Sequence, residues 1–290
     1  MKVAICVDAN SAYTRETAKE EGFFFLDMPV IIDGENFIQG VNLSSEDFYE
    51  ALAAGKNVTT SQPAPGVILD FWDNIFDQGY DQIVHIPMSS GLSTACDTAT
   101  MLSDDYDGKV QVVDNHRISV TLTSAALDAK RMVEKGYDAK QIKDELEKAG
   151  ADSGIYIAVD TLEYLKKGGR VTPAGAALGA LLGIKPILSI GGGKLDAYAK
   201  VRGTVKAKAK IVEAIKTEIE ERFPNVPKEK IKIFTADTLM TAEEETEWSK
   251  YVSEAFSEYG EIVSRKLSLS IGTHIGPGGF AAAYAIKLDV

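Results

Sequence analysis

The sequence predicts an α/β protein of two α/β lobes, with a parallel-rich sheet in the N-terminal lobe and a mixed sheet in the C-terminal lobe. Short apolar runs alternate with amphipathic segments along the chain, which is typical of a mainly parallel sheet with helices on both faces. The chain has 290 residues, 45% of them hydrophobic, which is enough for two domains of ordinary size. We expect the lobes to span residues 1–150 and 151–290.

The first elements of the N-terminal lobe are indicated by their ends. The apolar run Lys2–Val7 predicts a buried strand, and Thr14 is placed to cap a helix at 14–21. Asp33-Gly34 is a hairpin-type dipeptide between two apolar runs, and Ser44–Asp47 has the spacing of a capping box before another helix. The remaining elements are expected as helices at 65–76, 93–102, 119–134 and 139–149 and strands at 82–86 and 110–113.

The C-terminal lobe follows a connection at Gly150–Gly154. Residues 173–182 are rich in Ala, Gly and Leu and predict a helix, while Gly191–Gly193 predicts a turn between two strands. Residues 204–222 predict a long charged helix. The other strands are expected at 155–159, 185–190, 195–201, 231–235, 262–270 and 281–287, and the other helices at 162–167 and 242–259.

The charge of the chain limits its partners. The 43 acidic and 31 basic residues give a formal net charge of −12, and no block of Lys and Arg offsets it. Such a surface argues against nucleic acid or an anionic membrane as the main partner, although it is compatible with a basic protein. We therefore expect no nucleic-acid partner.

Cysteine usage and hydropathy indicate a soluble protein. Cys6 and Cys96 are too few for a disulfide framework and lack the spacing of a zinc site. The longest apolar candidate begins at Pro173 and is ended by Lys185 and Pro186, which is too short for a membrane span. We expect a cytoplasmic protein with no metal and no stable membrane insertion.

Three loops rich in glycine and small hydroxyl residues are the candidate binding elements. Open α/β sheets bind ligands beyond the carboxyl ends of their strands, where loops lead into helices. The loops are Thr59–Gly66, Ser89–Thr94 and His274–Gly279. Hydroxyl groups with free backbone N–H groups at a helix start suit a carboxylate or a phosphate. The alternative for Thr60 and Ser93 is that they are only N-caps.

Known catalytic motifs do not occur in the sequence. It contains no Gly-x-Ser-x-Gly elbow, no phosphate-binding P-loop and no Gly-x-Gly-x-x-Gly. A hydrolase triad of Ser90 or Ser93 with His274 and an Asp stays open, although no spacing supports it. His85 lies in a predicted strand and is interpreted as a core residue. Asp8 lacks a second carboxylate two residues on, so we interpret it as a helix cap or loop-orienting residue rather than a magnesium ligand.

Two basic segments stand out in this acidic chain. Tyr164–Arg170 ends a predicted short helix with two lysines and two glycines, as the helix dipole and a glycine C-cap favour. That interpretation accounts for the lysines but less well for Arg170, or for Arg202 in the run Lys200–Arg202. The hypothesis for both arginines is contact with an anion or with an acidic group of a partner.

Together these motifs resemble the DegV family, bacterial fatty-acid-binding proteins of the FakB type. The resemblance runs nearly from end to end, and the order and spacing of the motifs make it specific. It is carried by Thr60–Pro63, Ser89–Ser93, Leu165–Arg170, Ile184–Leu188, Lys200–Arg202 and His274–Gly278. The resemblance implies that the whole chain is one DegV-type unit that encloses a single long-chain fatty acid in a buried tunnel, with no cofactor.

The resemblance also implies roles for residues of the N-terminal lobe. Thr60 and Ser93 match the family residues that hold the carboxylate of the fatty acid. Ser61, Ser90 and Gly91 are implied as close neighbours of that head group. No residue is expected to be catalytic.

Three residues of the C-terminal lobe are assigned by the same resemblance. His274 is expected near the head group, directly or through water, and Arg170 and Arg202 in partner docking or in the head-group network. Family members of this type present the bound acid to a separate fatty acid kinase, which makes the acyl phosphate. The resemblance therefore implies a lipid-binding carrier in phospholipid metabolism rather than an enzyme.

Two motifs depart from the family pattern. Asp8-Ala9-Asn10 stands where Asp-Ser-Ser or Asp-Ser-Thr is usual, and Thr94-Ala95-Cys96 where Gly-Thr-Tyr is usual. These departures bear on the polar contacts of the first loop and on the chain preference. Candidates for the wall around the acyl tail are Ala174–Leu182 and Phe23–Phe25.

Two other functions stay open at this point. The first is a serine-dependent hydrolase or acyl-transfer enzyme that uses a Ser hydroxyl with His274, and a fluorophosphonate that labels a serine would favour it. The second is a lipid sensor or storage protein without a kinase partner, which a test for acyl phosphate formation would distinguish.

Overall fold

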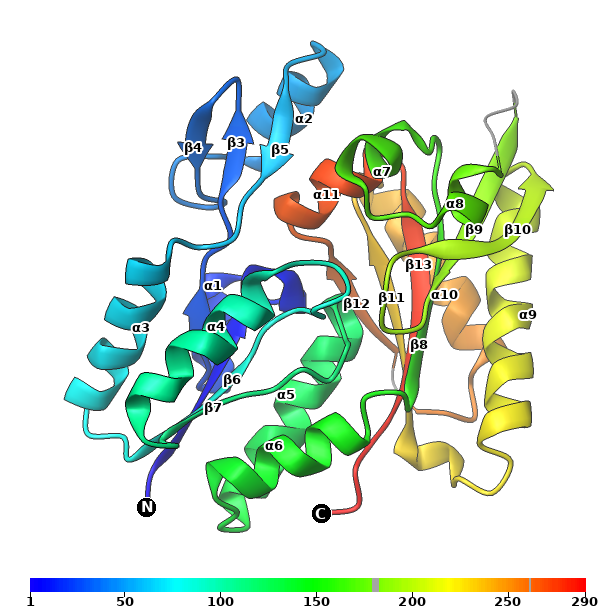
Figure 1. Ribbon diagram of the computed structural model, residues 1–290. Helices are drawn as coiled ribbons and strands as arrows, with labels where there is room; N and C mark the ends of the chain where they lie inside the picture. The colour runs from blue at the N-terminus through cyan, green and yellow to red at the C-terminus, as the bar shows by residue number, and fades with distance from the viewer. Residues whose placement is uncertain (179–182, 261) are drawn as a thin grey trace. The chain divides into compact units, whose positions relative to one another are not determined.

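A computed structural model describes residues 1–178, 183–260 and 262–290 of the chain (Figure 1). The chain forms two compact units. Unit 1 comprises Met1–Ala151 together with Leu288–Val290, and unit 2 comprises Asp152–Lys287. The last three residues thus belong to unit 1 and not to the lobe expected at 151–290, because Leu288 and Val290 pack against the core of unit 1.

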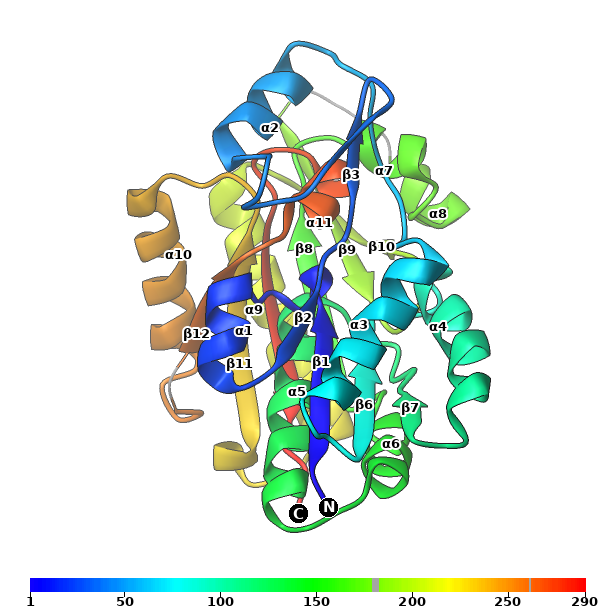
Figure 2. The same ribbon diagram turned by 90° about the vertical axis from the view of Figure 1, so that its left-hand side faces the viewer.

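Unit 1 is built on a parallel sheet of strand order β2-β1-β6-β7 (Figure 2). Its strands are β1 (Val3–Asp8), β2 (Phe24–Leu26), β6 (Gln82–Ile86) and β7 (Val110–Val112). The central strand β1 pairs in parallel with both β2 and β6, and every one of its residues is buried. Burial on both faces explains why this segment of the sequence is continuously apolar.

Helices cover both faces of the parallel sheet. The helices of unit 1 are α1 (Arg15–Glu21), α2 (Ser45–Ala53), α3 (Pro65–Asp77), α4 (Ala95–Ser103), α5 (Ser119–Glu134) and α6 (Ala139–Lys148), with short 3₁₀ turns η1 (Ala9–Ser11) and η2 (Asp104–Tyr106). Val3, Ile5 and Val7 of β1 pack with α5 and α6, whereas Ala4 and Cys6 pack with α3 and α4. The predicted α/β layers of this lobe are confirmed.

A small antiparallel sheet of order β4-β3-β5 extends unit 1 beyond the carboxyl ends of the parallel strands (Figure 1). Its strands are β3 (Val30–Ile32), β4 (Glu35–Phe37) and β5 (Val58–Thr60). Asp33 and Gly34 have φ angles of 51° and 92°, the left-handed pair that a tight hairpin requires, so the predicted hairpin is confirmed. Ser44 caps α2 by accepting from the Asp47 N–H at 3.0 Å.

Unit 2 is built on a mixed sheet of order β10-β9-β8-β13-β11-β12. Its strands are β8 (Ser153–Ala158), β9 (Ile184–Ile190), β10 (Asp196–Arg202), β11 (Ile231–Asp237), β12 (Ile262–Lys266) and β13 (Phe280–Ile286). β11 pairs in parallel with β12 and antiparallel with β13. The mixed sheet predicted for this lobe is confirmed.

The helices of unit 2 fall into two groups (Figure 1). They are α7 (Glu163–Gly168), α8 (Pro173–Ala176), α9 (Thr204–Arg222), α10 (Ala242–Ala255) and α11 (Leu269–Ile275), with the 3₁₀ turn η3 (Lys228–Lys230). The long helices α9 and α10 pack on one face of the sheet through Ile211, Ile215, Trp248 and Val252. The short helices α7, α8 and α11 gather at one end of the sheet, where the motifs of this unit lie.

Two predicted elements of unit 2 are wrong in part. The helix expected at 173–182 ends at Ala176, a turn covers residues 177–178, and residues 179–182 lie outside the described part of the chain. The strand expected at 262–270 ends at Lys266, and α11 begins at Leu269. Ser268 caps α11 by accepting from the Ile271 N–H at 3.2 Å, a local interaction that overrides the strand-like alternation of leucines around it.

Candidate functional site

Polar residues follow the strands of unit 1 at the carboxyl edge of its parallel sheet. Asp8 ends β1, is 1% exposed, and accepts hydrogen bonds from the Asn10 N–H at 2.8 Å and the Met88 N–H at 2.9 Å. Burial raises the pKa of Asp8 to about 6, although the two N–H donors act in the opposite direction. Asp8 therefore caps η1 and fixes the start of the loop after β6, as the sequence predicted.

The loop Ser89–Ser93 is a tight turn held by its own hydrogen bonds. The Gly91 N–H donates to Ser89 Oγ at 3.1 Å, and the Ser93 N–H donates to the Ser89 carbonyl at 3.2 Å. The Ser90 N–H donates to Asp114 Oδ1 at 3.3 Å. The expectation of free N–H groups is therefore wrong for these residues, and the hydroxyl groups of Ser90 and Ser93 are the donors that this loop can offer an anion.

Thr60 is not an N-cap, because it is the last residue of β5 and α3 begins only at Pro65, with Ala64 as its N-cap. Ser93 does contribute to the start of α4, since its Oγ accepts from the Ala95 N–H at 3.1 Å. The N-cap alternative is thus wrong for Thr60 and holds in part for Ser93.

Gln62 joins the two hydroxyl loops of unit 1. Its Oε1 accepts from the Thr94 hydroxyl at 2.9 Å, and its Nε2 donates to Thr98 Oγ1 at 3.1 Å. Gln62 is two residues after Thr60, and Thr94 directly follows Ser93, so this bridge brings the two loops together. Ser61 is fixed beside them, because its N–H donates to the Pro29 carbonyl at 3.2 Å and its hydroxyl to the Gln62 carbonyl at 2.9 Å.

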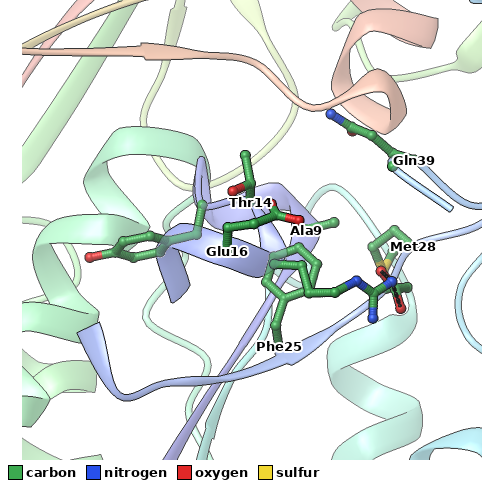
Figure 3. Close-up of a pocket in the computed structure, with 10 residues that line it drawn as sticks. Ala9, Thr14, Glu16, Phe25, Met28 and Gln39 are labelled. Atoms are coloured by element: carbon green, nitrogen blue, oxygen red, sulfur yellow. Dashed lines mark hydrogen bonds and ion pairs between the residues drawn. The ribbon is translucent and has the colours of Figure 1, made fainter. Parts of the chain in front are cut away.

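A pocket of about 110 Å³ opens near the same edge of unit 1 (Figure 3). Ala9, Phe25 and Met28 contribute apolar surface to it (Figure 3), and Gln39 also lines it. Arg15 Nη2 lies 2.8 Å from both carboxylate oxygens of Asp27 at its rim. Phe25 thus lines a cavity, and its contact with an acyl tail stays a prediction, whereas Phe23 is a core residue that packs against Tyr13.

In unit 2, the motif that contains His274 packs tightly against the motif that contains Gly168. A Cβ atom at Gly168 would come closer than 3.0 Å to His274 Nδ1 and Cε1. At Gly276, φ is 76° and a Cβ would come closer than 3.0 Å to Cδ2 and Cε2 of Tyr164. These glycines are required because α7 and α11 approach closely, which places His274 against the end of α7.

His274 is held as a neutral imidazole at neutral pH. Burial, together with the smaller effect of the positive charge of Arg170, lowers the pKa of His274 to about 4. Arg170 follows Gly169, the left-handed C-cap of α7 that the sequence predicted, and its Nη1 donates to the Gly168 carbonyl. The structure therefore brings Arg170 and His274 into one cluster.

Arg202 lies apart from that cluster. The Leu195 N–H donates to the Arg170 carbonyl at 2.9 Å, so the backbone of Arg170 lies beside the start of β10, whereas Arg202 is exposed at its other end. β10 is 7 residues long, and at about 3.3 Å per residue it separates the two backbone positions by roughly 20 Å. Arg170 and Arg202, which were predicted to act in docking or in the head-group network, therefore do not belong to one cluster.

Lys185, in the motif Ile184–Leu188, forms an ion pair with Asp160. Since a Cβ at Gly278 would come closer than 3.0 Å to Asp160 Oδ2, this pair lies beside the glycines that follow α11. The motif Ile184–Leu188 therefore contributes one ion pair beside the segment that follows His274.

Within the described ranges, the structure contains no group of three or more His, Cys, Asp or Glu side chains that could hold a metal ion. In the same ranges, none of the helices has both the length and the apolar character that crossing a membrane requires.

The sequence comparisons identify the family. The family model described as "Uncharacterised protein, DegV family" matches residues 2–287. A DegV domain-containing protein of Streptococcus pneumoniae is 31% identical over 98% of this chain and 99% of that protein. One from Listeria innocua is 30% identical over 99% of each. The chain belongs to the DegV family.

Solved structures share this fold over the whole chain. A fatty-acid-binding DegV family protein from Thermus thermophilus superimposes with a TM-score of 0.88 at 24% identity and covers 99% of this chain and 100% of that one. A fatty-acid-binding DegV family protein from Streptococcus agalactiae gives a TM-score of 0.85 at 25% identity, with coverage of 99% and 100%. A DegV lipid-binding protein from Thermotoga maritima gives 0.83 at 25%, with coverage of 99% of each.

Two contributions to the site were not anticipated from the sequence. Asp114, which orients Ser90, lies two residues after β7 at the carboxyl edge, a position that could have suggested a loop-orienting role. Met88 packs against Ala9, Met28 and Ala95, and no local pattern marks these residues as neighbours.

Proposed function

We propose that this protein binds a single long-chain fatty acid and presents its carboxylate to a partner fatty acid kinase, which forms the acyl phosphate. The observation that carries the proposal is the pair of hydroxyl loops at the carboxyl edge of unit 1, which Gln62 joins by a hydrogen bond. One loop contains Thr60, at the end of β5, and the other contains Ser93, just before α4. The fatty-acid-binding and lipid-binding relatives at 25% identity support the class of ligand.

The energetics of such a ligand divide between its tail and its head group. Burial of about 14 methylenes offers on the order of 11 kcal/mol before ordering costs. Each charge-assisted hydrogen bond from a hydroxyl to the carboxylate adds roughly 1.5–3 kcal/mol. The tail therefore sets most of the affinity, while Thr60 and Ser93 fix the orientation of the carboxylate.

Unit 2 supplies the remaining head-group and docking residues in this proposal. His274 is neutral at neutral pH, so it can donate or accept a hydrogen bond near the head group without adding a charge. Arg170 belongs to the same cluster and supplies the positive charge. Arg202, exposed at the far end of β10, is assigned to docking of the kinase. The kinase brings the ATP-binding machinery, for which this sequence has no motif.

The first experiment is mass spectrometry of an organic extract from the freshly purified and then denatured protein. A near-stoichiometric long-chain fatty acid is the expected result. A different lipid would contradict the carboxylate assignment. No lipid, followed by no uptake during incubation with fatty acids, would remove the proposed function and leave only the fold.

The head-group assignment is tested with the double variant Thr60→Ala and Ser93→Ala. We expect it to retain the fold but to lose fatty acid in an exchange assay at least about tenfold faster, since about 1.4 kcal/mol corresponds to that factor. Thr59→Ala with Ser103→Ala is the matched control, because Thr59 precedes Thr60 in β5 and Ser103 ends α4, the helix that begins two residues after Ser93. Equal lipid retention and equal acyl phosphate formation in both double variants would overturn the assignment.

The kinase step is tested with a bacterial fatty acid kinase, ATP and lipid-loaded protein, with the acyl phosphate trapped by hydroxylamine. Arg170→Glu should abolish product while bound lipid changes little, whereas Lys250→Glu on the exposed face of α10 should leave product formation unchanged. Lipid binding without any acyl phosphate in the wild type would instead favour a sensor or storage protein. A serine labelled by a fluorophosphonate would favour the hydrolase.

A further inference from the structure

Arg117 is a buried cation beside the loop Ser89–Ser93. It is 3% exposed and lies in the connection from β7 to α5, at the carboxyl edge of the parallel sheet of unit 1. Its Nε donates to the Gly150 carbonyl at 3.2 Å, and its Nη2 donates to the Ala149 carbonyl at 2.6 Å. Both carbonyls directly follow α6, at a helix end where carbonyl groups need donors from outside the helix. The planar guanidinium contacts two acceptors at once, so the direction of the side chain is fixed.

The backbone of Arg117 holds the loop that contains Ser93. The Arg117 carbonyl accepts from the Ser89 N–H at 2.9 Å, and Ser89 is 1% exposed. The Ser89 carbonyl in turn accepts from the Ser93 N–H at 3.2 Å. Two backbone hydrogen bonds therefore lead from Arg117 to Ser93, and the guanidinium continues this chain of contacts to the end of α6.

Asp114 forms a second link between the same loop and α6. Its Oδ1 accepts from the Ser90 N–H at 3.3 Å. Its own N–H donates at 3.0 Å to Oε1 of Glu147, a residue near the end of α6. The backbones of Ser90 and Ser93 are therefore both positioned relative to the end of α6.

The connection that carries Arg117 has a strained backbone. His116 and Ser119 have φ angles of 57° and 56°, in the left-handed region that residues other than glycine rarely adopt. Such a conformation persists only where the surrounding contacts determine it. The Arg117 N–H donates to Asn115 Oδ1 at 3.1 Å, and a Cβ atom at Gly150 would stand 2.5 Å from the Asn115 carbonyl oxygen. Loss of the Arg117 side-chain contacts should therefore let this connection relax.

We propose that Arg117 is a positioning residue, which sets the place of the Ser93 hydroxyl by tying its loop to the end of α6. The proposal rests on the proposed function and adds a residue to the same site. In the proposed kinase step, a carboxylate oxygen attacks the γ-phosphorus of ATP and ADP leaves. A displacement of about 1 Å in such a step can lower its rate on the order of 100-fold. Loss of Arg117 should therefore slow acyl phosphate formation more than it reduces bound fatty acid, because the tail sets most of the affinity.

The experiment compares wild type, Arg117→Met and Arg117→Lys as substrates of a bacterial fatty acid kinase with ATP. Each protein is loaded with palmitic acid, and the loaded fraction is measured first. We expect Arg117→Met to lower kcat at least about tenfold while KM for the loaded protein changes less than about threefold, since the residues assigned to docking are untouched. Arg117→Lys keeps the charge but lacks the planar fork that contacts two carbonyls, so its kcat should be intermediate.

Arg131→Met is the matched control, because Arg131 lies on α5 of the same unit and also donates to a backbone carbonyl, that of Leu288, at 3.2 Å. It should keep the wild-type kcat. An equal kcat in Arg117→Met and Arg131→Met would overturn the positioning role and leave acyl phosphate formation intact. A wild-type kcat in Arg117→Lys would contradict the need for contact with both carbonyls. A wild type that forms no acyl phosphate would instead overturn the proposed kinase step, and with it the role of Arg117 in that step.

A second measurement uses the unmodified protein and does not depend on the folding of any variant. Amide hydrogen exchange of Ser89, Ser93 and Gly150 is followed by NMR at increasing urea concentrations. If the loop is tied to the end of α6, these amides open in one event, and their protection factors should fall in parallel and stay within about threefold of one another. The Gly22 N–H at the end of α1 is the control and should exchange independently. Protection of Ser89 and Ser93 that is lost at lower urea than that of Gly150 would overturn the proposal.

Discussion

Unit 1 and unit 2 both carry motifs of the DegV family, but the motif side chains act differently in the two units. In unit 1, the motifs around Thr60 and Ser93 present hydroxyl groups from loops that are linked by hydrogen bonds through Gln62. In unit 2, the motifs around Gly168 and His274 are defined by glycines that allow α7 and α11 to approach each other. In the proposed function the first arrangement offers donors to a ligand, whereas the second fixes the position of one imidazole.

The difference teaches that a glycine-rich motif does not always mark a backbone that binds a ligand. The glycines at 168 and 276 leave no room for a Cβ atom, because His274 and Tyr164 occupy that space. The hydroxyl loops of unit 1 depend instead on polar contacts such as Gln62 to Thr94, which a substitution weakens without a steric clash. We therefore expect large effects on stability in unit 2 and small ones in the loops of unit 1.

The largest effect is expected for Gly168→Ala. The added methyl group overlaps the imidazole of His274, so α7 or α11 must shift, and we expect the free energy of unfolding to fall by about 3 kcal/mol. Urea denaturation measures this change. The control is Gly193→Ala in the same unit, where a Cβ meets no atom within 4 Å, and it should change stability by less than about 1 kcal/mol. Equal stability of the two variants would contradict the close packing of the two motifs.

His274 should make unit 2 sensitive to acid. Its pKa is about 4 in the folded protein and about 6.5 in an unfolded chain, so its stabilising contribution is complete above pH 6.5 and is lost as pH falls through 4. We expect the wild type to lose about 2–3 kcal/mol between pH 7 and pH 4 that His274→Gln does not lose. Urea denaturation at several pH values tests this. His116→Gln, at an exposed histidine, is the control and should follow the wild type.

Asp8 should give unit 1 the opposite pH dependence. Its pKa is about 6 when folded and about 3.9 when unfolded, so the folded state holds its proton more tightly, and stability is lost as pH rises from 4 through 6. We expect the difference in the free energy of unfolding between wild type and Asp8→Asn to change by about 2 kcal/mol over this window. The same pH profile in both proteins would contradict the burial of an ionisable Asp8. Asp70→Asn, on the exposed face of α3, is the control.

The elements that the sequence predicted well are those with local signals. Thr14 accepts from the Thr17 N–H and forms the predicted start of α1, and Asp33-Gly34 forms the predicted hairpin. β2 and β5 were not predicted, because a strand of three residues is too short for its periodicity to be read. The first two residues of α11 fall within the strand predicted at 262–270, because Leu267, Leu269 and Ile271 alternate with polar residues, and the cap at Ser268 starts a helix there instead.

In the candidate site, too, features with a local sequence pattern were predicted, whereas contacts between segments far apart in the sequence were not. The hydroxyl loops were predicted from their position after strands and from their composition, and the structure adds that Gln62 connects them over 32 residues of sequence. The contact between Gly168 and His274 joins two segments more than a hundred residues apart, so no local pattern contains it. The separation of Arg170 from Arg202 likewise follows from the length of β10, which the motifs alone do not reveal.

The smallest expected effect tests the bridge between the hydroxyl loops. Gln62→Ala removes the hydrogen bonds to Thr94 and Thr98, which are partly exposed, so we expect the free energy of unfolding to fall by only about 1 kcal/mol. Lipid exchange should nevertheless be faster, because the loops that carry Thr60 and Ser93 are no longer tied together. Gln78→Ala at the end of α3 is the control, since its side-chain amide donates to the Asn74 carbonyl of the same helix at 2.9 Å.

Stability and exchange together separate two explanations for the Gln62 variant. If the bridge only stabilises the fold, Gln62→Ala should exchange lipid no faster than a variant of equal stability with a substitution elsewhere in unit 1. If the bridge positions the hydroxyl groups, exchange should be faster at the same stability, and a Gln62→Glu variant should restore part of the effect, because its carboxylate can still accept from Thr94. Only the second result makes Gln62 a positioning residue. It would show that the hydrogen bonds between the unit 1 loops act on ligand exchange, whereas the glycine contacts of unit 2 act on stability.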